Sequence, residues 1–295
     1  MGVVEAENMD TPNRSLKYFE GERWLVLTGL LGFLLAGVCA VWVLFNGENV
    51  APDGSVSDAF SFNAAMGIFL LSTAAIAPFS ALSVKGRSFF RRSYILLALY
   101  SYFAETVQNF RGVDPRFVKS GVPFDNIIGF IFTAVALLLV LCYLFLAVQF
   151  FRKKAYILRP TLVTGIRYAM IAVMFSFIAG IWISVNNGRI VGDQGNIIVL
   201  HGIGFHALQA IPVVAWLSER ITSAIKTPRI WTHVAGISYL LGLLALGWQT
   251  YLGRDLFEWS LLSVFVFSCF FISLLTGVQV LYKALSGRSK AKIWV

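Results

Sequence analysis

The stretch IIGFIFTAVALLLVLCYLFLAVQF, residues 127–150, decides the fold, because no charged side chain interrupts its 24 positions. About 20 apolar residues in a helix are enough to cross the hydrocarbon core of a bilayer. The whole chain shares this character: of its 295 residues, 58% are hydrophobic and only 13% are charged. An ordinary soluble domain has about 25% charged residues. A soluble globule is therefore excluded, and we expect an integral membrane protein.

Apolar runs bounded by charged or turn residues predict an all-α, polytopic bundle of eight transmembrane helices. The third run is the weakest, because Glu105, Gln108 and Asn109 lie in its second half. We expect one membrane domain, residues 23–285, between an N-terminal tail, 1–22, and a basic C-terminal tail, 286–295. No repeat with a period of 20–50 residues is apparent. The predicted spans are 24–46, 60–84, 94–110, 125–150, 161–185, 198–218, 230–251 and 259–283.

The basic residues predict the orientation. With eight spans, 18 lysines and arginines lie in the tails and loops of one side, and five lie in the loops of the other. The positive-inside rule then places both termini in the cytoplasm. We expect the protein to lie in the cytoplasmic membrane. The net charge of +9 is explained by cations flanking the spans beside anionic headgroups, so the bilayer, and not a nucleic acid, is the expected partner.

Ionisable groups within spans are candidates for function, because inserting one costs at least about 2.5–3.5 kcal/mol. Glu105, Gln108 and Arg111 project from one face of the third span, and His206 shares a face with Gln209 in the sixth. Helical rise from the expected span ends puts Glu105 and His206 at one level, near mid-membrane. We therefore expect an outward-facing polar pocket between spans three and six. Its candidate ligand-binding residues are Glu105, Gln108, Arg111, Asp125, Arg189, Asp193, His201, His206 and Gln209.

Three functions remain open. The leading hypothesis is binding or transport of a small polar or lipid-headgroup ligand, with Glu105 and His206 as a proton-exchanging pair. The second is metal-assisted hydrolysis, with zinc or another divalent ion on Glu105, His201 and His206. The third is a structural or assembly subunit whose polar residues hold helices together. Bis-histidine haem is disfavoured, because His233 lies near the cytoplasmic end of its span, far in depth from His206. Neither the ligand nor the oligomeric state follows from the sequence.

Several of these residues fall into short motifs. Glu105-x-x-Gln108-x-x-Arg111-Gly112, Phe124-Asp125, Gly192-Asp193 and His201-x-x-Gly204-x-His206-Ala207-Leu208-Gln209 resemble an uncharacterised family of bacterial multi-pass membrane proteins. The family pattern has a histidine directly before the phenylalanine of the outer loop, where this chain has Arg116 before Phe117, and its Gly-Asp pair stands closer to the histidine. The resemblance implies a shared site but no particular reaction, and the departure at Arg116 weakens the metal hypothesis.

Overall fold

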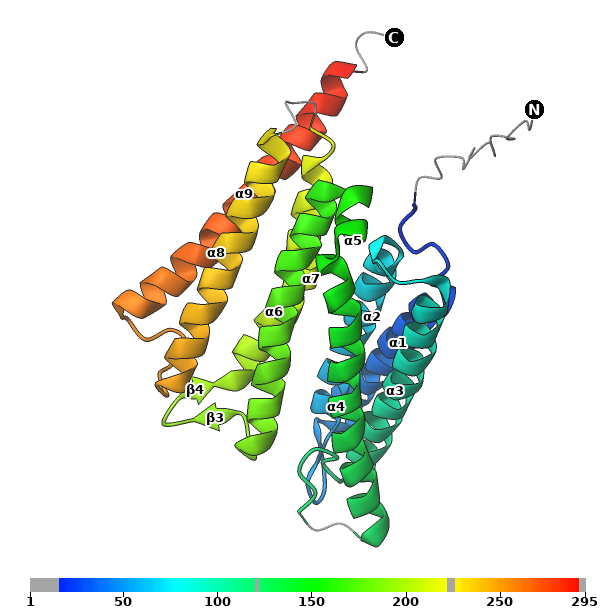
Figure 1. Cartoon of the computed structure of the whole chain (residues 1–295). Helices are drawn as coiled ribbons and strands as arrows, with labels where there is room; N and C mark the ends of the chain where they lie inside the picture. The colour runs from blue at the N-terminus through cyan, green and yellow to red at the C-terminus, as the bar shows by residue number, and fades with distance from the viewer. Residues whose placement is uncertain (1–15, 120–121, 222–225, 292–295) are drawn as a thin grey trace, which may run out of the picture.

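The computed structural model describes residues 16–119, 122–221 and 226–291 (Figure 1). Within these ranges the only β-structure is two short hairpins, so the all-α prediction is confirmed. The first hairpin pairs β1 (Asn49–Val50) with β2 (Gly54–Ser55), and the second pairs β3 (Ile190–Val191) with β4 (Gly195–Asn196). The helices are α1 (Arg23–Asn46), α2 (Val56–Ile76), the 3-10 turn η1 (Ala77–Phe79), α3 (Val84–Phe110), α4 (Pro123–Phe151), α5 (Lys153–Leu158), α6 (Pro160–Val185), α7 (Ile197–Ser218), α8 (Lys226–Tyr251) and α9 (Leu261–Ala291).

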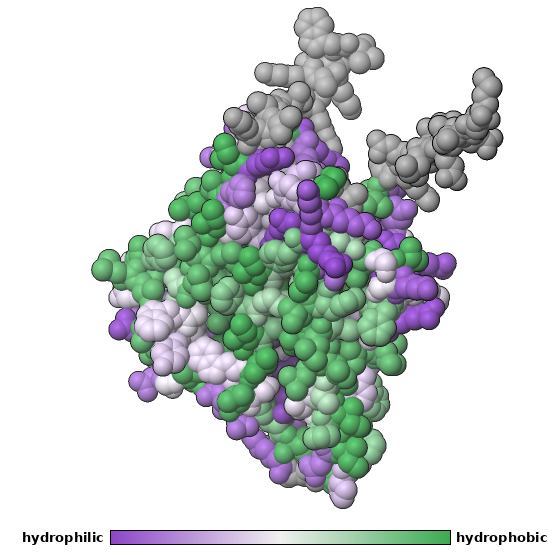
Figure 2. Space-filling view, viewed as in Figure 1, coloured by the Kyte–Doolittle hydropathy of each residue, from purple (hydrophilic) through white to green (hydrophobic). Residues whose placement is uncertain are grey.

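Seven of these helices, all except α3 and α5, are long and apolar enough to cross a membrane. Figure 2 shows hydrophobic residues across the middle of one face and hydrophilic residues gathered toward its ends. Large apolar side chains point outward from the bundle, such as Phe130 on α4, which is 78% exposed, and Leu274 on α9, which is 62% exposed. Such surfaces are unfavourable in water and suit contact with lipid. The protein is therefore a multi-pass membrane protein.

The remaining long helix, α3, begins ten residues earlier than its apolar run predicts. Ser83 caps its N-terminus by accepting a hydrogen bond from the backbone N–H of Gly86 at 3.1 Å. The first turns carry cations such as Lys85 and Arg87, and the last turns carry Glu105, Gln108 and Asn109, so no sufficiently apolar window exists. The helix nevertheless packs against α1, α2 and α4 within the bundle. The crossing of α3, and with it the count of eight spans, stays a prediction.

The eight long helices form two units with the same order of elements. The first unit comprises α1, its hairpin, α2, α3 and α4; the second comprises α6, its hairpin, α7, α8 and α9. The short α5 joins them, and in each unit the two hairpin-linked helices pack most extensively. The register is constant, because Asn49 corresponds to Ile190 and Gly112 to Gly253, an offset of 141 residues. The chain thus contains an internal repeat far longer than the 20–50-residue periods considered from the sequence.

The correspondence extends to individual hydrogen bonds. The backbone N–H of Asp53 donates to the carbonyl oxygen of Gly112 at 2.9 Å, and that of Gln194 donates to Gly253 at 3.0 Å. Gly112 and Gly253 have φ angles of +80° and +70°, a conformation that favours glycine. Each hairpin is therefore fixed to the end of the third helix of its own unit by the same backbone geometry.

Both units have the same orientation, because each contains an even number of long helices. The start of α1 and the end of α9 lie at one end of the bundle, here called the termini end, and both hairpins lie at the other, the hairpin end (Figure 1). The end of α2 and the start of α3 lie at the termini end, as does the α4–α6 connection, which carries Arg152, Lys153, Lys154 and Arg159. The arrangement is a parallel repeat, with the two units related about an axis along the bundle.

At the termini end, a buried carboxylate joins the start of α1 to α3. The side chain of Glu22 is fully buried and forms ion pairs with Arg87 (Oε1 to Nε, 3.2 Å) and Arg91 (Oε2 to Nη1, 3.4 Å). Burial raises the pKa of Glu22 more than the neighbouring Arg91 and Arg87 guanidinium groups lower it. The ion pairs therefore only partly offset the desolvation of the carboxylate.

This balance predicts a pH dependence of stability. Because the pKa is higher in the folded state, the folded chain binds the proton more tightly, and stability is lost as pH rises from about 4.3, the ordinary glutamate value. The unfolding temperature of the wild type in detergent, relative to that of Glu22→Gln, is expected to fall as the pH rises from 4 to 7. Glu48→Gln, at an exposed position, is the control. A wild type that gains stability over Glu22→Gln across this range would contradict the prediction.

Candidate functional site

The most buried ion pair of the hairpin end joins α3 to the loop that follows it. The side chain of Glu105 is fully buried, and its Oε1 accepts a hydrogen bond from Nε of Arg116 at 2.6 Å. The Arg116 side chain is 31% exposed and lies 5.7 Å from the ring of Phe62 on α2. The second carboxylate oxygen of Glu105 faces the amide of Asn109 at 3.4 Å. A fully buried carboxylate is thus paired with an arginine whose side chain is partly accessible to solvent.

Three of the predicted residues form a second cluster between the ends of α3 and α4. Gln108 donates from Nε2 to Oδ1 of Asp125 at 2.9 Å, and Arg111 donates to the same oxygen at 2.6 Å. Arg111 also donates to Oε1 of Gln108 at 2.5 Å and lies over the ring of Phe124. The side chains of Gln108 and Asp125 are buried, whereas that of Arg111 is 41% exposed. Three of the nine candidate ligand-binding residues are therefore brought together at the hairpin end of the first unit.

Charged groups of the two units meet at the hairpin end. Arg189, which precedes β3 in the second unit, lies 3.6 Å from the carboxylate of Asp58 on α2 of the first unit. Asp58 also acts electrostatically on Glu105 and Arg116, and Arg116 acts on His201 of α7. We call these five residues, Asp58, Glu105, Arg116, Arg189 and His201, the inter-unit charge cluster.

The two histidines of α7 have different surroundings. Nδ1 of His201 lies 2.7 Å from the carbonyl oxygen of Ser176 on α6, and the Ser176 hydroxyl donates to the His201 carbonyl. His206 is exposed, with Nδ1 3.2 Å from Oε1 of Gln209. Gln209 in turn donates to the hydroxyl of Ser72 on α2 at 2.8 Å, which is a second polar contact between the units.

The predicted Glu105–His206 pair is not formed. Glu105 lies five residues, about 8 Å, from the hairpin end of α3, whereas His206 lies nine residues, about 14 Å, from that of α7. His201, four residues from its helix start, is the histidine at the level of Glu105. The prediction placed them differently because it took α3 to begin at 94 and counted depth from there. Moreover, α3 packs mainly within the first unit and α7 mainly within the second. The polar faces of these two helices therefore do not line one shared pocket.

The proposed three-ligand metal site is not assembled either. In the described ranges, no three His, Cys, Asp or Glu side chains lie close enough to hold a metal ion. Glu105 contacts Arg116, His201 contacts Ser176 and His206 contacts Gln209. Asp193 is exposed in the turn of the second hairpin. His233, on α8, lies 2.9 Å from the hydroxyl of Tyr168 on α6.

The second unit offers an internal comparison for these charges. It keeps the supporting frame, since Gln249 corresponds to Gln108 and Gly253 to Gly112. It does not keep the ionisable groups: at the same offset, Leu246 stands for Glu105, Leu252 for Arg111 and Phe257 for Arg116. Leu246 is buried in the main apolar core. The same local fold therefore forms without the Glu105–Arg116 ion pair.

Aromatic side chains fill the interface between the units below the charges. The ring of Phe69 on α2 lies 4.8 Å from that of Phe205 on α7 and 4.7 Å from that of Tyr143 on α4. Phe177 on α6 completes the cluster, 5.1 Å from Phe205 and 5.7 Å from Tyr143. His201 lies against the hairpin-side edge of this cluster, 4.8 Å from Phe205. The inter-unit charge cluster thus lies on the hairpin side of the aromatic rings, whereas the Gln209–Ser72 hydrogen bond lies deeper between the units.

Two cluster members, Arg116 and Asp58, were not among the predicted site residues. Arg116 lies in a loop, where a cation needs no partner, and Asp58 lies in the first turn of α2, where an acidic residue is expected for capping. The charges of Arg116 and Asp58 alone therefore did not mark them as site residues. Comparison with protein-family models, curated proteins and solved structures finds no match to this chain.

Proposed function

We propose that the protein binds a small organic anion at the inter-unit charge cluster and carries it across the cytoplasmic membrane. The supporting observation is the exposure of the charged side chains. The Arg116 and Arg189 side chains are 31% and 53% exposed, whereas their partners Glu105 and Asp58 are 0% and 34% exposed. The Glu105 carboxylate is therefore buried beside a partly exposed arginine, whereas Arg189 and Asp58 are both accessible to solvent. Exposed, oriented guanidinium groups suit carboxylate or phosphate ligands.

The internal repeat supports a carrier. In several transporter folds two repeated bundles enclose the substrate between them, and rocking of one bundle against the other alternates access. Here the termini end of the interface is closed: Arg159 of the second unit pairs with Glu219 and lies 5.3 Å from the rings of both Tyr18 and Phe79. Among the ion-paired charges described on the two sides of the aromatic cluster, Arg189 at the hairpin end is more exposed than Arg159 or Glu219 at the termini end, which is consistent with an outward-facing state.

The Arg189–Asp58 contact supplies a test of anion binding. Thermal unfolding of the purified protein is expected to shift upward with succinate or glycerol 3-phosphate and not with choline, because binding to the folded state stabilises it. Arg189→Gln is expected to reduce the anion-induced shift. Arg254→Gln, 45% exposed at the same end and paired with Glu258 at 4.0 Å, is the matched control. Stabilisation by choline alone would contradict an anion site.

The proposed orientation, with eight spans and both termini in the cytoplasm, has its own test. Cysteines placed at exposed Lys85 and Lys119, on either side of α3, are expected to react with a membrane-impermeant maleimide from opposite sides. The background carries alanine at Cys39, Cys142 and Cys269. In intact cells Lys119→Cys should be labelled, and Lys85→Cys only after lysis. Labelling of both from one side would show that α3 does not cross.

A further inference from the structure

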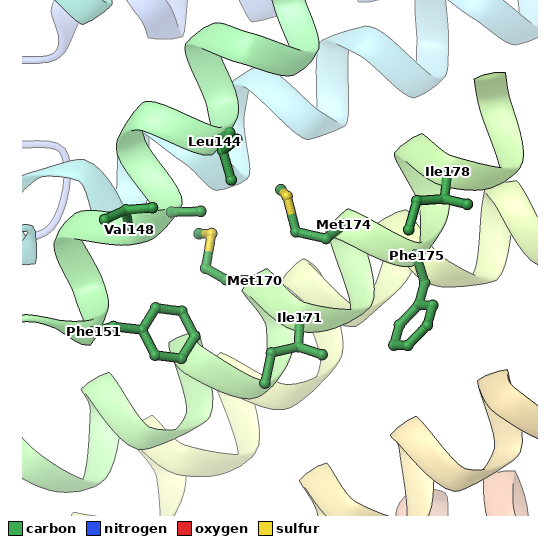
Figure 3. Close-up of a pocket in the computed structure, with 9 residues that line it drawn as sticks. Leu144, Val148, Phe151, Met170, Ile171, Met174, Phe175 and Ile178 are labelled. Carbon is green, nitrogen blue, oxygen red and sulfur yellow. The ribbon is translucent and has the colours of Figure 1, made fainter.

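Besides the charge cluster, the seam between the two units carries an apolar groove of about 250 Å³. It runs between α4, the last helix of the first unit, and α6, the first helix of the second (Figure 3). Its lining is entirely apolar, from Leu144 to Phe151 on α4 and from Met170 to Ile178 on α6. The floor is buried, since Met170 is 0% exposed, while the rim is open, with Val148 51% exposed.

One end of this groove is cationic. Phe151 lines the groove where α4 ends, and the guanidinium group of Arg167 lies 5.7 Å from its ring. Arg167 is held there by donating to the carbonyl oxygens of Phe150 at 2.8 Å and Phe151 at 3.4 Å. The next residues, Arg152, Lys153 and Lys154, are exposed. An apolar channel that ends in several cations at the edge of the apolar belt matches the shape and charge of an anionic phospholipid.

We infer that an anionic phospholipid occupies the α4–α6 groove, with one acyl chain along its apolar lining and the phosphate beside Arg167. An apolar groove on a lipid-facing surface excludes water, so an acyl chain is the occupant available to it. Two methionines, Met170 and Met174, allow the lining to adapt to a flexible chain. Because α4 and α6 belong to different units, the bound lipid contacts both and stabilises their packing across the seam. This inference does not depend on the anion carried at the other end.

The test compares lipids on the purified full chain in detergent. Phosphatidylglycerol is expected to bind and to raise the unfolding temperature more than phosphatidylcholine, measured by native mass spectrometry and thermal unfolding. Arg167→Gln should weaken phosphatidylglycerol binding about fivefold, the effect of one cation near a headgroup. Val148→Trp, which fills the groove from its rim, should abolish it. Each shift is taken relative to the same variant without lipid, so a change in basal stability does not enter.

The controls lie outside the groove. Val264→Trp on α9 replaces a valine of 48% exposure, and Arg23→Gln removes an exposed cation at the same end of the bundle. Both should bind phosphatidylglycerol as the wild type does. Equal binding of the two lipids, unchanged binding in Val148→Trp, or the same stabilisation by inorganic phosphate alone would each overturn the assignment.

Discussion

Replacing Arg116 with phenylalanine is expected to destabilise the protein by about 3–5 kcal/mol, because the fully buried carboxylate of Glu105 then has no cationic partner. Replacing Glu105 with leucine should cost less, since the partly exposed Arg116 can turn toward water. The double variant Glu105→Leu/Arg116→Phe is expected to be close to the wild type. It places at these positions the residues that the second unit carries at Leu246 and Phe257. The measurement is the free energy of unfolding of all four proteins.

The same double variant separates folding from function. If it folds, it should no longer be stabilised by succinate or glycerol 3-phosphate, because the ligand-facing guanidinium group is gone. If the protein were instead a structural subunit whose charges hold helices together, a folded double variant would still assemble with its partners. A double variant as unstable as Arg116→Phe would mean that the pair is needed for folding, and the comparison between the units would then fail as an argument for function.

The helices could be predicted from the sequence because lipid exposure demands long apolar runs. The start of α3 could not, because hydropathy reports contact with lipid and not helix formation. Arg91 and Arg92 end the apolar run, but the helix continues past them to the Ser83 cap. Because depth was counted from residue 94 and not from residue 84, Glu105 was expected near mid-membrane. His206, expected at the same depth, was therefore predicted to be its partner. Gln108 and Arg111 were expected on one face because they are three residues apart, and both contact Asp125.

The repeat escaped prediction for a related reason. Helices in lipid need only be apolar, so two copies can diverge until most of their side chains differ. What persists is backbone geometry, in glycines that meet a hairpin and in amides that cap helix ends. Gln108 donates to Asp125 in the first turn of α4 at 2.9 Å, and the equivalent Gln249 donates to Ser263 in the first turn of α9 at 3.1 Å, although Asp125 and Ser263 are 138 residues apart and not 141. Only a few positions 141 residues apart carry matching residues, and these are too few to reveal the repeat in a chain of 295 mostly apolar residues.

Gly112→Ala is expected to cost about 2–5 kcal/mol, from two effects that act together. A residue with a side chain is strained by about 1–2 kcal/mol at a φ of +80°. In addition, its Cβ would collide with the carbonyl of Ala51 in the hairpin, and overpacking adds about 1–3 kcal/mol. Because this carbonyl belongs to the backbone, the whole hairpin must move, which also disturbs the hydrogen bond from the Asp53 N–H to the Gly112 carbonyl oxygen. Thermal unfolding measures the loss.

Three further glycines separate the two effects. Gly253→Ala, at the equivalent position, has a φ of +70° but meets its hairpin at 3.0 Å, so it should lose less than Gly112→Ala. Gly47→Ala has a φ of +81° with a ψ of 176°, a backbone region that is essentially restricted to glycine, and it has open space around it, so it should lose only the cost of that strain, about 1–3 kcal/mol. Gly37→Ala, inside α1 with open space, should lose nothing. A Gly112→Ala loss no larger than that of Gly47→Ala would show that the hairpin is not fixed against α3. The frame that holds Arg116 and Glu105 in place would then have to be sought elsewhere.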